Sequence, residues 1–415
     1  MSVGTKAVVG LAAGLAAGAG LAASARPAWL AVGAGVEVAG TLWINAILMT
    51  ILPLVVSKLV VSIAVQDYPR GVGRSGWKAV ALFLELLTVT AALAAAVMPS
   101  VFARLPIDPS AAAALRASAR AALPAPAAAA SAEQSVLALV PANAVRAAAD
   151  GAIVPLLVFT VAFAFGASRI PRALRDPLVT LFRAVDAAVT VLLHWIVALS
   201  PYGVFALGLG LAMHVGVGIV TSLAYYIAVS SVALVLAIAA LYVVVFLFAG
   251  VSPKAFAEAA APAQVVAFGT HSSLASLPAM IDGAEARLGL SQTATGFVLP
   301  LSLAVFKYSG PIWFVTVTYF VGRLYDVAID PSRAAAIVLA AVLTSFAVGG
   351  VPSGAAVVVA PVLAAAGLPL EAMGVLLAVD PLPNAFRTVA NVTGMLAVSV
   401  LADGRKASRR TAPAD

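Results

Sequence analysis

The sequence predicts an all-α polytopic membrane protein with eight transmembrane helices and two re-entrant helical hairpins arranged as inverted repeats. Hydrophobic residues make up 63% of the 415 positions, charged residues make up 10%, and the mean hydropathy is +1.09. Apolar runs recur along the chain at about the length that crosses roughly 30 Å of hydrocarbon. Two further apolar segments are interrupted at their centres by small and polar residues, which is typical of hairpins rather than of single spans.

Six apolar runs precede the hairpins, at residues 7–25, 38–65, 77–102, 153–167, 178–213 and 217–249. The first is too long for a secretory signal and its basic flank is the single residue Lys6, so it is predicted to be a spanning helix. The last two are longer than one span needs. They are expected to tilt, bend or extend into water.

Basic residues gather at the ends of these runs and indicate orientation. They are Arg70, Arg74 and Lys78, then Arg169, Arg172 and Arg175, and finally Arg405, Lys406, Arg409 and Arg410. The positive-inside rule places all three groups, and both chain termini, on the cytoplasmic side of the plasma (cell inner) membrane. No interleaved basic and aromatic surface accompanies the net charge of +7, so binding to nucleic acid is not expected.

Cysteine and histidine usage narrows the chemistry further. The chain has no cysteine, which excludes disulfides, thiolate catalysis and cysteine-based metal sites. Its three histidines are scattered, so a histidine-rich metal centre is not expected either. No cofactor is predicted.

The interrupted segments at 253–281 and 332–366 carry their polar tips at 269–278 and 349–354. Each is followed by one long predicted helix, at 292–321 and at 370–402. The unit of hairpin and helix therefore occurs twice with opposite topology, which points to a transport site near the middle of the membrane.

These elements predict five regions. They are scaffold helices 1–3 at 1–102, a low-complexity extracellular loop at 103–150, helices 4–6 at 151–250, a transport core at 251–403, and a basic cytoplasmic tail at 404–415.

The last predicted helix concentrates polar residues on one face. Asp380, Asn384, Arg387, Thr388 and Asn391 follow spacings of three and four. A guanidinium in the hydrocarbon region costs about 2.5 to 3.5 kcal/mol unless it has a partner, and a bound anion is the expected one. Pairing with Asp380, or snorkelling to an interface, are the alternatives. The Asp380-Pro381 pair also predicts a helix break.

The hairpin tips offer an anion free backbone N–H groups at the starts of half-helices. Gly349, Gly350 and Gly354 allow close approach of the backbone, and Pro352 fixes the turn. Arg387 can then bind a carboxylate through two parallel hydrogen bonds.

With these elements in place, the chain resembles the dicarboxylate/amino acid:cation symporters, the family of glutamate and aspartate transporter homologues. The matching motifs are the tip Thr270–Pro278, the tip Gly350-Val351-Pro352, the run Arg387–Gly394, and the earlier runs Leu52–Val56 and Ser200–Ala206. The resemblance covers nearly the whole chain. It implies a homotrimer in the lipid bilayer whose hairpins and last two helices move as an elevator against a static scaffold.

The same resemblance implies a set of substrate-binding residues. They are Ser272, Ser273, Val351, Pro352, Gly354, Ala355, Asn384, Arg387, Thr388 and Asn391. The position of Asn384 is an aspartate that binds the substrate ammonium in amino-acid carriers of the family. Asparagine there favours a dicarboxylate without an amino group over aspartate or glutamate.

Sodium-coupled members carry an Asn-Met-Asp-Gly-Thr motif where this chain has Phe306–Gly310. Phe306, Tyr308 and, in the last helix, Met395 replace oxygen ligands, so no metal site is expected at these positions. Lys307 is expected to supply a positive charge in place of sodium, permanently or by exchanging a proton, unless it only snorkels or pairs with a carboxylate. His271 and Asp380 are the other coupling candidates.

The favoured function is therefore secondary symport of a small organic anion, expected to be a C4-type dicarboxylate, with a proton or a fixed lysine charge in place of sodium. A sodium-coupled symporter of acidic amino acids is the first alternative, and an uncoupled anion channel or ligand sensor is the second. An intramembrane hydrolase using Ser272 or Ser273 with His271 is disfavoured, because neighbours in sequence do not make a triad. The protein is not expected to be an enzyme.

Overall fold

The computed structural model describes residues 3–24, 26–64, 73–107, 140–150, 152–215, 219–346, 358–370 and 372–403, and these form helices and no strands. The all-α prediction is confirmed. Within these ranges six helical segments are long and apolar enough to cross a membrane. They are Pro27–Val61, Trp77–Phe102, Arg172–Ala198, Thr221–Ala249, Ala294–Tyr325 and Leu382–Asp403.

A glycine seam joins α1 (Val3–Ser24) to α9 (Ser200–Val215). A Cβ atom added to Gly10, Gly14 or Gly18 would lie 2.2–2.4 Å from a carbonyl oxygen of α9. Small residues four apart let two helix backbones approach this closely, which is how many helices associate in a membrane. The seam fixes α1 along the length of α9.

Helix α2 (Pro27–Ala64) is the centre of the N-terminal group, because it packs against α7 (Ile153–Arg169), α8 (Arg172–Ala198) and α9. The run predicted at 178–213 was expected to tilt, bend or extend into water because it is longer than one span needs, and the helix breaks at Leu199 between α8 and α9. Pro201 stands in the first turn of α9, where its missing N–H leaves no intrahelical bond unmade.

The expected loop at 103–150 contains a short helix, α6 (Ala144–Ala149), whose first turn is capped by the Asn143 side chain. Residues 108–139 of that loop lie outside the described ranges.

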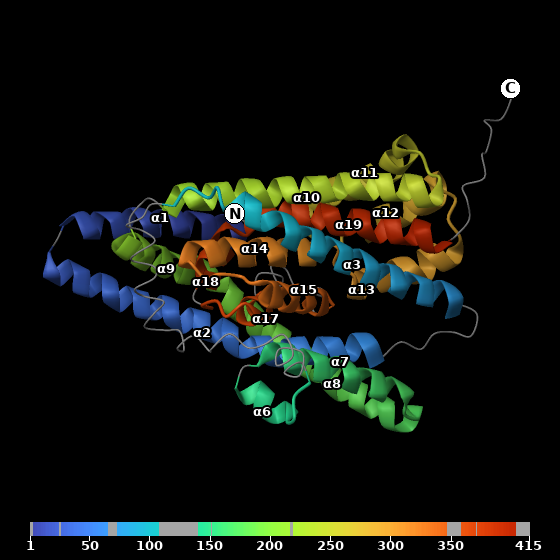
Figure 1. Ribbon diagram of the computed structural model, residues 1–415, viewed down its shortest axis with the longest axis horizontal. Helices are drawn as coiled ribbons and strands as arrows, with labels where there is room; N and C mark the ends of the chain where they lie inside the picture. The colour runs from blue at the N-terminus through green and yellow to red at the C-terminus, as the bar shows by residue number, and fades with distance from the viewer. Residues whose placement is uncertain are drawn as a thin grey trace.

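Two early helices pack on the C-terminal half of the chain. Helix α3 (Gly73–Phe102) contacts α14 (Ser309–Tyr325), α15 (Pro331–Ser345) and α19 (Pro381–Asp403). Helix α10 (Ile219–Ala249) contacts α11 (Pro253–Thr270), α14 and α19. Figure 1 shows α3, α10 and α19 lying together on one side of the bundle, with α2, α7 and α8 on the other. The Lys78 ammonium donates to the Leu401 carbonyl at 2.6 Å, so the start of α3 and the end of α19 lie at the same end of the molecule.

The first interrupted segment folds back on itself. Helix α11 (Pro253–Thr270) runs to a tip at residues 271–276, and α12 (Leu277–Asp282) with the π-helical turn η1 (Gly283–Arg287) returns along it. A Cβ on Gly283 would lie 2.2 Å from the Ala259 carbonyl oxygen, and these two residues are equally far in sequence from His271. The arms are therefore antiparallel about the tip.

The helix predicted at 292–321 is interrupted. It consists of the π-helical turn η2 (Ala294–Val298), α13 (Leu299–Val305) and α14 (Ser309–Tyr325). Phe306 between them has extended backbone, with φ −109° and ψ 113°. The break falls at the Phe306-Lys307-Tyr308 run, and the backbone N–H of Ser309 at the start of α14 donates to the Asn391 side chain at 2.9 Å. A neighbouring helix therefore supplies the acceptor that a helix start lacks.

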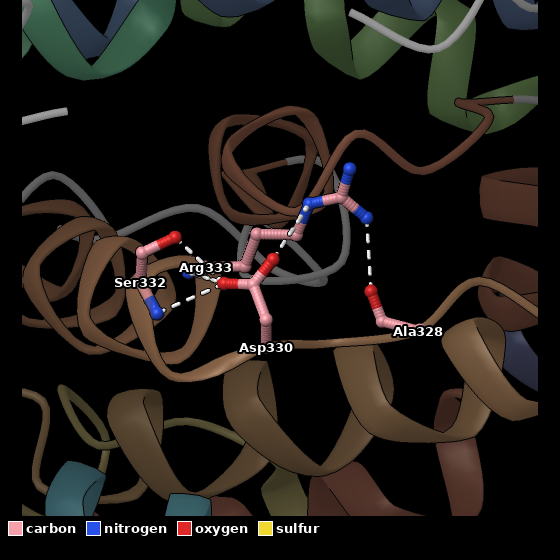
Figure 2. A network of polar contacts seen from close by, with 4 residues as sticks. All are labelled: Ala328, Asp330, Ser332 and Arg333. Carbon is pink, nitrogen blue, oxygen red and sulfur yellow. Dashed lines mark hydrogen bonds and ion pairs between the residues drawn. The ribbon is translucent and has the colours of Figure 1, made fainter. Parts of the chain in front are cut away.

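The second interrupted segment contains α15 (Pro331–Ser345) and α17 (Ala360–Ala365), which pack together. Figure 2 shows the capping network at the start of α15, where the Asp330 carboxylate accepts hydrogen bonds from the Ser332 hydroxyl and from the backbone N–H groups of Ser332 and Arg333. Residues 347–357, which include the predicted tip, lie outside the described ranges. The last helix breaks at Asp380 into α18 (Ala372–Val379) and α19 (Pro381–Asp403), as the Asp-Pro pair predicts.

Candidate functional site

Arg387 is the centre of the candidate site. It lies on α19 with 2% of its surface exposed, which rules out snorkelling. Its guanidinium carbon sits 4.0 Å from the ring centroid of Trp313 on α14, and one nitrogen, Nη2, lies 2.6 Å from Asp380 Oδ1. A cation over an aromatic face is stabilised by about 2 kcal/mol or more when the pair is desolvated. Arg387 is thus held by a carboxylate at one edge and by an indole against its face.

Arg387 therefore pairs with Asp380 in this structure. This pairing is the first of the two alternatives to a bound anion that the sequence analysis named. Both side chains are 2% exposed. Among the described residues, the Nε and Nη1 atoms of Arg387 have no hydrogen-bond partner although they are buried. A buried N–H group without a partner is costly, so these two donors are open to an acceptor that the described residues do not supply.

Asn384 connects Arg387 to the first hairpin tip. Its Oδ1 accepts from Arg387 Nη2 at 2.9 Å, and its Nδ2 lies 3.4 Å from His271 Nδ1. His271 ends α11 with left-handed backbone, φ 55°, which is uncommon for a residue other than glycine. The predicted site residues of α19 and of the first tip therefore meet in space.

Other predicted site residues have local roles. The Thr388 hydroxyl donates to the Asn384 carbonyl of its own helix at 2.8 Å, and the Ser272 hydroxyl accepts from the Ala275 N–H at 3.2 Å within the tip. Ser273 is partly buried in the same tip. Neither contact supports a serine nucleophile paired with His271, because His271 lies against Asn384 instead. Val351, Pro352, Gly354 and Ala355 lie outside the described residues.

Aromatic rings fill the space at two of the three positions where sodium ligands were expected to be lost. Phe306 is fully buried and stacks on Phe83 of α3 with ring centroids 4.6 Å apart. The Tyr308 hydroxyl donates to the Ala237 carbonyl of α10 at 3.2 Å, and a Cβ on Gly394 would lie 2.8 Å from the Tyr308 side chain. The third position, Met395, is fully buried. Aromatic rings and a thioether offer poor ligands to a hard cation.

Lys307 is buried beside these rings, with 7% of its surface exposed, and its ammonium donates to the Leu303 carbonyl at 2.9 Å. The nearby charge that acts on it is the ammonium of Lys58 on α2. Lys58 itself pairs with Asp186 of α8 at 3.0 Å.

Sequence reasoning missed the residues that support Arg387 from behind. The Trp313 indole N–H donates to the Tyr226 hydroxyl at 2.8 Å, and Tyr226 stacks on Phe320. Tryptophan and tyrosine are common in membrane helices, so their presence in the sequence did not indicate a site. Only the packing of α10 against α14 brings them to the site.

A charged centre enclosed by packed spanning helices and reached by a helical hairpin defines a membrane carrier. The sequence model of the sodium:dicarboxylate symporter family matches residues 4–405, and the chain belongs to that family. It is a multi-pass membrane transporter and not an enzyme.

Characterised relatives are similar over most of the chain. The proton/glutamate-aspartate symporter of Escherichia coli is 29% identical over 379 residues, covering 90% of this chain and 86% of that protein. The proton/sodium-glutamate symport protein of Bacillus subtilis is 25% identical over 369 residues, covering 87% and 84%. The human neutral amino acid transporter A is 29% identical over 245 residues, covering 58% and 46%.

Proposed function

We propose that this protein is a symporter that carries a small organic dianion, of the C4-dicarboxylate type, across the plasma membrane. The observation that carries the proposal is the buried Arg387, whose Nε and Nη1 atoms have no partner among the described residues. Each of those two atoms lies on a different edge of the guanidinium and shares that edge with Nη2, so each edge keeps one N–H donor for a substrate carboxylate oxygen.

The neutral side chain beside Arg387 supports a dicarboxylate over an amino acid. Asn384 uses its oxygen to accept from Arg387, so what it offers a substrate is an amide donor. A donor suits a carboxylate and disfavours an ammonium group. The substrate then contributes two negative charges, which Arg387 and the hairpin tips bind.

Coupling by a charge other than sodium is supported by the packing at Phe306 and Tyr308. Rings occupy those positions, and the buried ammonium of Lys307, which lies between them in sequence, donates to the Leu303 carbonyl. In the proposed cycle Lys307 supplies the positive charge that a sodium ion would otherwise bring. Proton coupling is in keeping with the E. coli relative, which is named a proton symporter.

Movement of the core as an elevator within a homotrimer is the proposed mechanism. The two groups of helices support it, because α1, α2, α7, α8 and α9 pack mainly among themselves while α3 and α10 pack on the core. We therefore assign α3 and α10 to the moving part, which changes the predicted boundary of the scaffold at residue 102.

The test is uptake into vesicles containing the purified protein. Succinate, malate, aspartate and glutamate are supplied under an imposed proton gradient or sodium gradient, one at a time. We expect concentrative uptake of succinate or malate that follows the proton gradient and ignores sodium. Arg387→Lys keeps the charge beside Asp380 but loses the fork, and should weaken substrate affinity by about 100-fold.

Arg183→Lys, on the exposed face of α8, is the matched control and should bind as the unmodified protein does. Uptake driven only by sodium would contradict the coupling proposal. In that case Lys307→Met should have no effect on ion dependence. Current or binding without concentrative uptake would instead indicate a channel or a sensor.

The second candidate is a symporter of acidic amino acids, favoured by the names of the E. coli and B. subtilis relatives. It predicts that aspartate or glutamate outcompetes succinate in the same vesicles. That outcome would change the proposed substrate but not the proposed role of Arg387 in binding a carboxylate.

A further inference from the structure

The Asn384 amide accepts a hydrogen bond from Arg387 and faces His271 with its nitrogen, and these two roles cannot be exchanged. Arg387 can only donate, so the Asn384 atom 2.9 Å from it must be the oxygen, and the amide cannot be turned around. The other end of the amide is then an N–H donor, and it faces Nδ1 of His271 at 3.4 Å. Nδ1 must accept, which requires a neutral imidazole with its proton on Nε2.

A protonated His271 is incompatible with this arrangement. Both ring nitrogens of an imidazolium carry hydrogen, so Nδ1 would present a donor to the donor of Asn384. The hydrogen bond that ties the first tip to α19 would be lost. The Nδ1–H group of His271 could then donate to a negatively charged acceptor.

The position of His271 suits exchange of a proton with water. It lies at the tip between α11 and α12, its side chain is exposed, and its backbone is held at φ 55°. The charged groups that face it are Asp380 and Arg387 at the α18–α19 break. Tyr226 lies behind Arg387, where its hydroxyl accepts from the Trp313 indole. The other titratable groups on α11 and on the elements packed against it are Tyr225, Tyr242, Lys254, Glu258, Asp282, Glu285, Arg287 and Asp403.

We propose that His271 carries the coupled proton and binds the substrate carboxylate in its protonated form. Nδ1 takes a proton from water on the loading side, releases Asn384 and donates to a carboxylate oxygen of the dianion held by Arg387. On the other side the proton returns to water as the substrate leaves. The N–H bond at Nδ1 forms with a proton from the water on the loading side and breaks when that proton returns to the water on the other side, and no other bond changes. The inference rests on the proposed function for the identity of the anion.

Binding of proton and substrate must then favour each other. The linkage is reciprocal, so substrate takes up a proton when it binds, and lowering the pH tightens substrate binding. Substrate affinity measured against pH should therefore fall as the pH is raised. One linked proton gives at most about tenfold in affinity for each pH unit.

The experiment is calorimetric titration of the purified full-length protein with succinate in two buffers of different ionisation enthalpy. We expect about one proton taken up for each succinate bound by the unmodified protein. His271→Asn keeps an acceptor near the position of Nδ1 and tolerates left-handed backbone, but it does not titrate. It should take up no proton and lose the pH dependence of affinity.

His194→Asn on α8 is the matched control, because it removes an exposed histidine away from the site and should keep the proton uptake. Protonation of succinate itself is common to all variants and cancels in the comparison. His271→Lys, which can donate but not accept, is a second variant that should also show no proton uptake. It guards against a failure of His271→Asn to fold.

Equal proton uptake by the unmodified protein and His271→Asn would overturn the proposal. Loss of uptake in Lys307→Met but not in His271→Asn would also overturn it and assign the proton to Lys307. If the protein binds aspartate and not succinate, the proposed substrate fails. The proton count measured with aspartate then still decides the role of His271.

Discussion

Asn384 sits between a cation and a hairpin tip and has no charge of its own. A carboxylate at this position would lie within reach of Arg387 and provide a partner for a substrate ammonium. One side chain therefore separates a site for dicarboxylates from a site for acidic amino acids. Its effect is electrostatic and should be large, because the surroundings are poorly hydrated.

Asn384→Asp should shift preference from succinate towards aspartate. We expect the ratio of the two affinities to change by about tenfold or more in favour of aspartate, because the new carboxylate repels a dianion and pairs with an amine. Competition between labelled succinate and unlabelled aspartate measures the ratio.

Asn384→Ser, which adds no charge, is the matched control and should leave the order of preference as it is. A ratio unchanged in Asn384→Asp would show that this side chain does not contact the distinguishing part of the substrate.

Among the elements, α15 depends on a capping residue at its first turn. Asp330 accepts from the Ser332 hydroxyl at 2.6 Å and from two backbone N–H groups at 2.9 Å. The Ser332 hydroxyl, followed by the Arg333 N–H, lowers the pKa of Asp330 below its ordinary value. A carboxyl group with a lowered pKa stabilises the folded state above its ordinary pKa, and that stabilisation is lost as pH falls through the lowered value.

Asp330→Ala should loosen the first turn of α15 at neutral pH, since an unpaired N–H group at a helix start exchanges readily with solvent. Amide hydrogen exchange of residues 332–335 is the measurement. Asp330→Asn is the control, because asparagine caps a helix about as well as aspartate.

In the unmodified protein the amides of residues 332–335, which exclude Pro331 because proline has no N–H, should stay protected down to about pH 4 and lose protection only below it, after correction for intrinsic exchange. Equal exchange in Asp330→Ala and the unmodified protein would mean that packing alone holds this turn.

The break between α13 and α14 shows how one element completes another. Asn391 of α19 accepts from the Ser309 N–H, and Phe306 stacks on Phe83 of α3. Three segments distant in sequence thus meet at the run 306–310. The sequence showed an unusual motif there but not a helix end, because both the acceptor and the aromatic partner come from elsewhere in the chain.

At the scale of the whole molecule, the proposal divides the helices into a static and a moving group. Cysteine bridges can test it without interference, because the chain has no cysteine. A Phe102→Cys and Tyr225→Cys pair joins α3 to α10 where their rings lie 6.2 Å apart. We expect uptake to persist when this bridge forms, since both helices are assigned to the moving group.

A bridge across the contact between α9 and α18 should stop uptake, and reduction should restore it. Uptake measured before and after reduction separates the two cases. Reversible arrest by the α3–α10 bridge would place a sliding boundary between those helices and contradict the assignment.

Composition and the spacing of apolar runs were enough to predict an all-helical membrane protein, the helix break at Asp380 and the polar face of α19. They did not predict the break at Leu199 or the glycine seam of α1. A glycine repeat with spacing of four acquires meaning only when a partner backbone lies against it. Likewise, Arg387 could be recognised by its cost in hydrocarbon, but its pairing with Trp313 depends on the packing of α14.

The pairing of Arg387 with Asp380 affects how the protein returns to its starting conformation after it has released the substrate. The guanidinium is paired with the Asp380 carboxylate at the break before α19, so the two side chains together carry no net charge. In the proposed cycle the substrate-free protein then returns without moving net charge on these two residues, and it needs no counter-transported solute. Such a carrier can concentrate its substrate against a gradient and is not restricted to exchanging one substrate molecule for another.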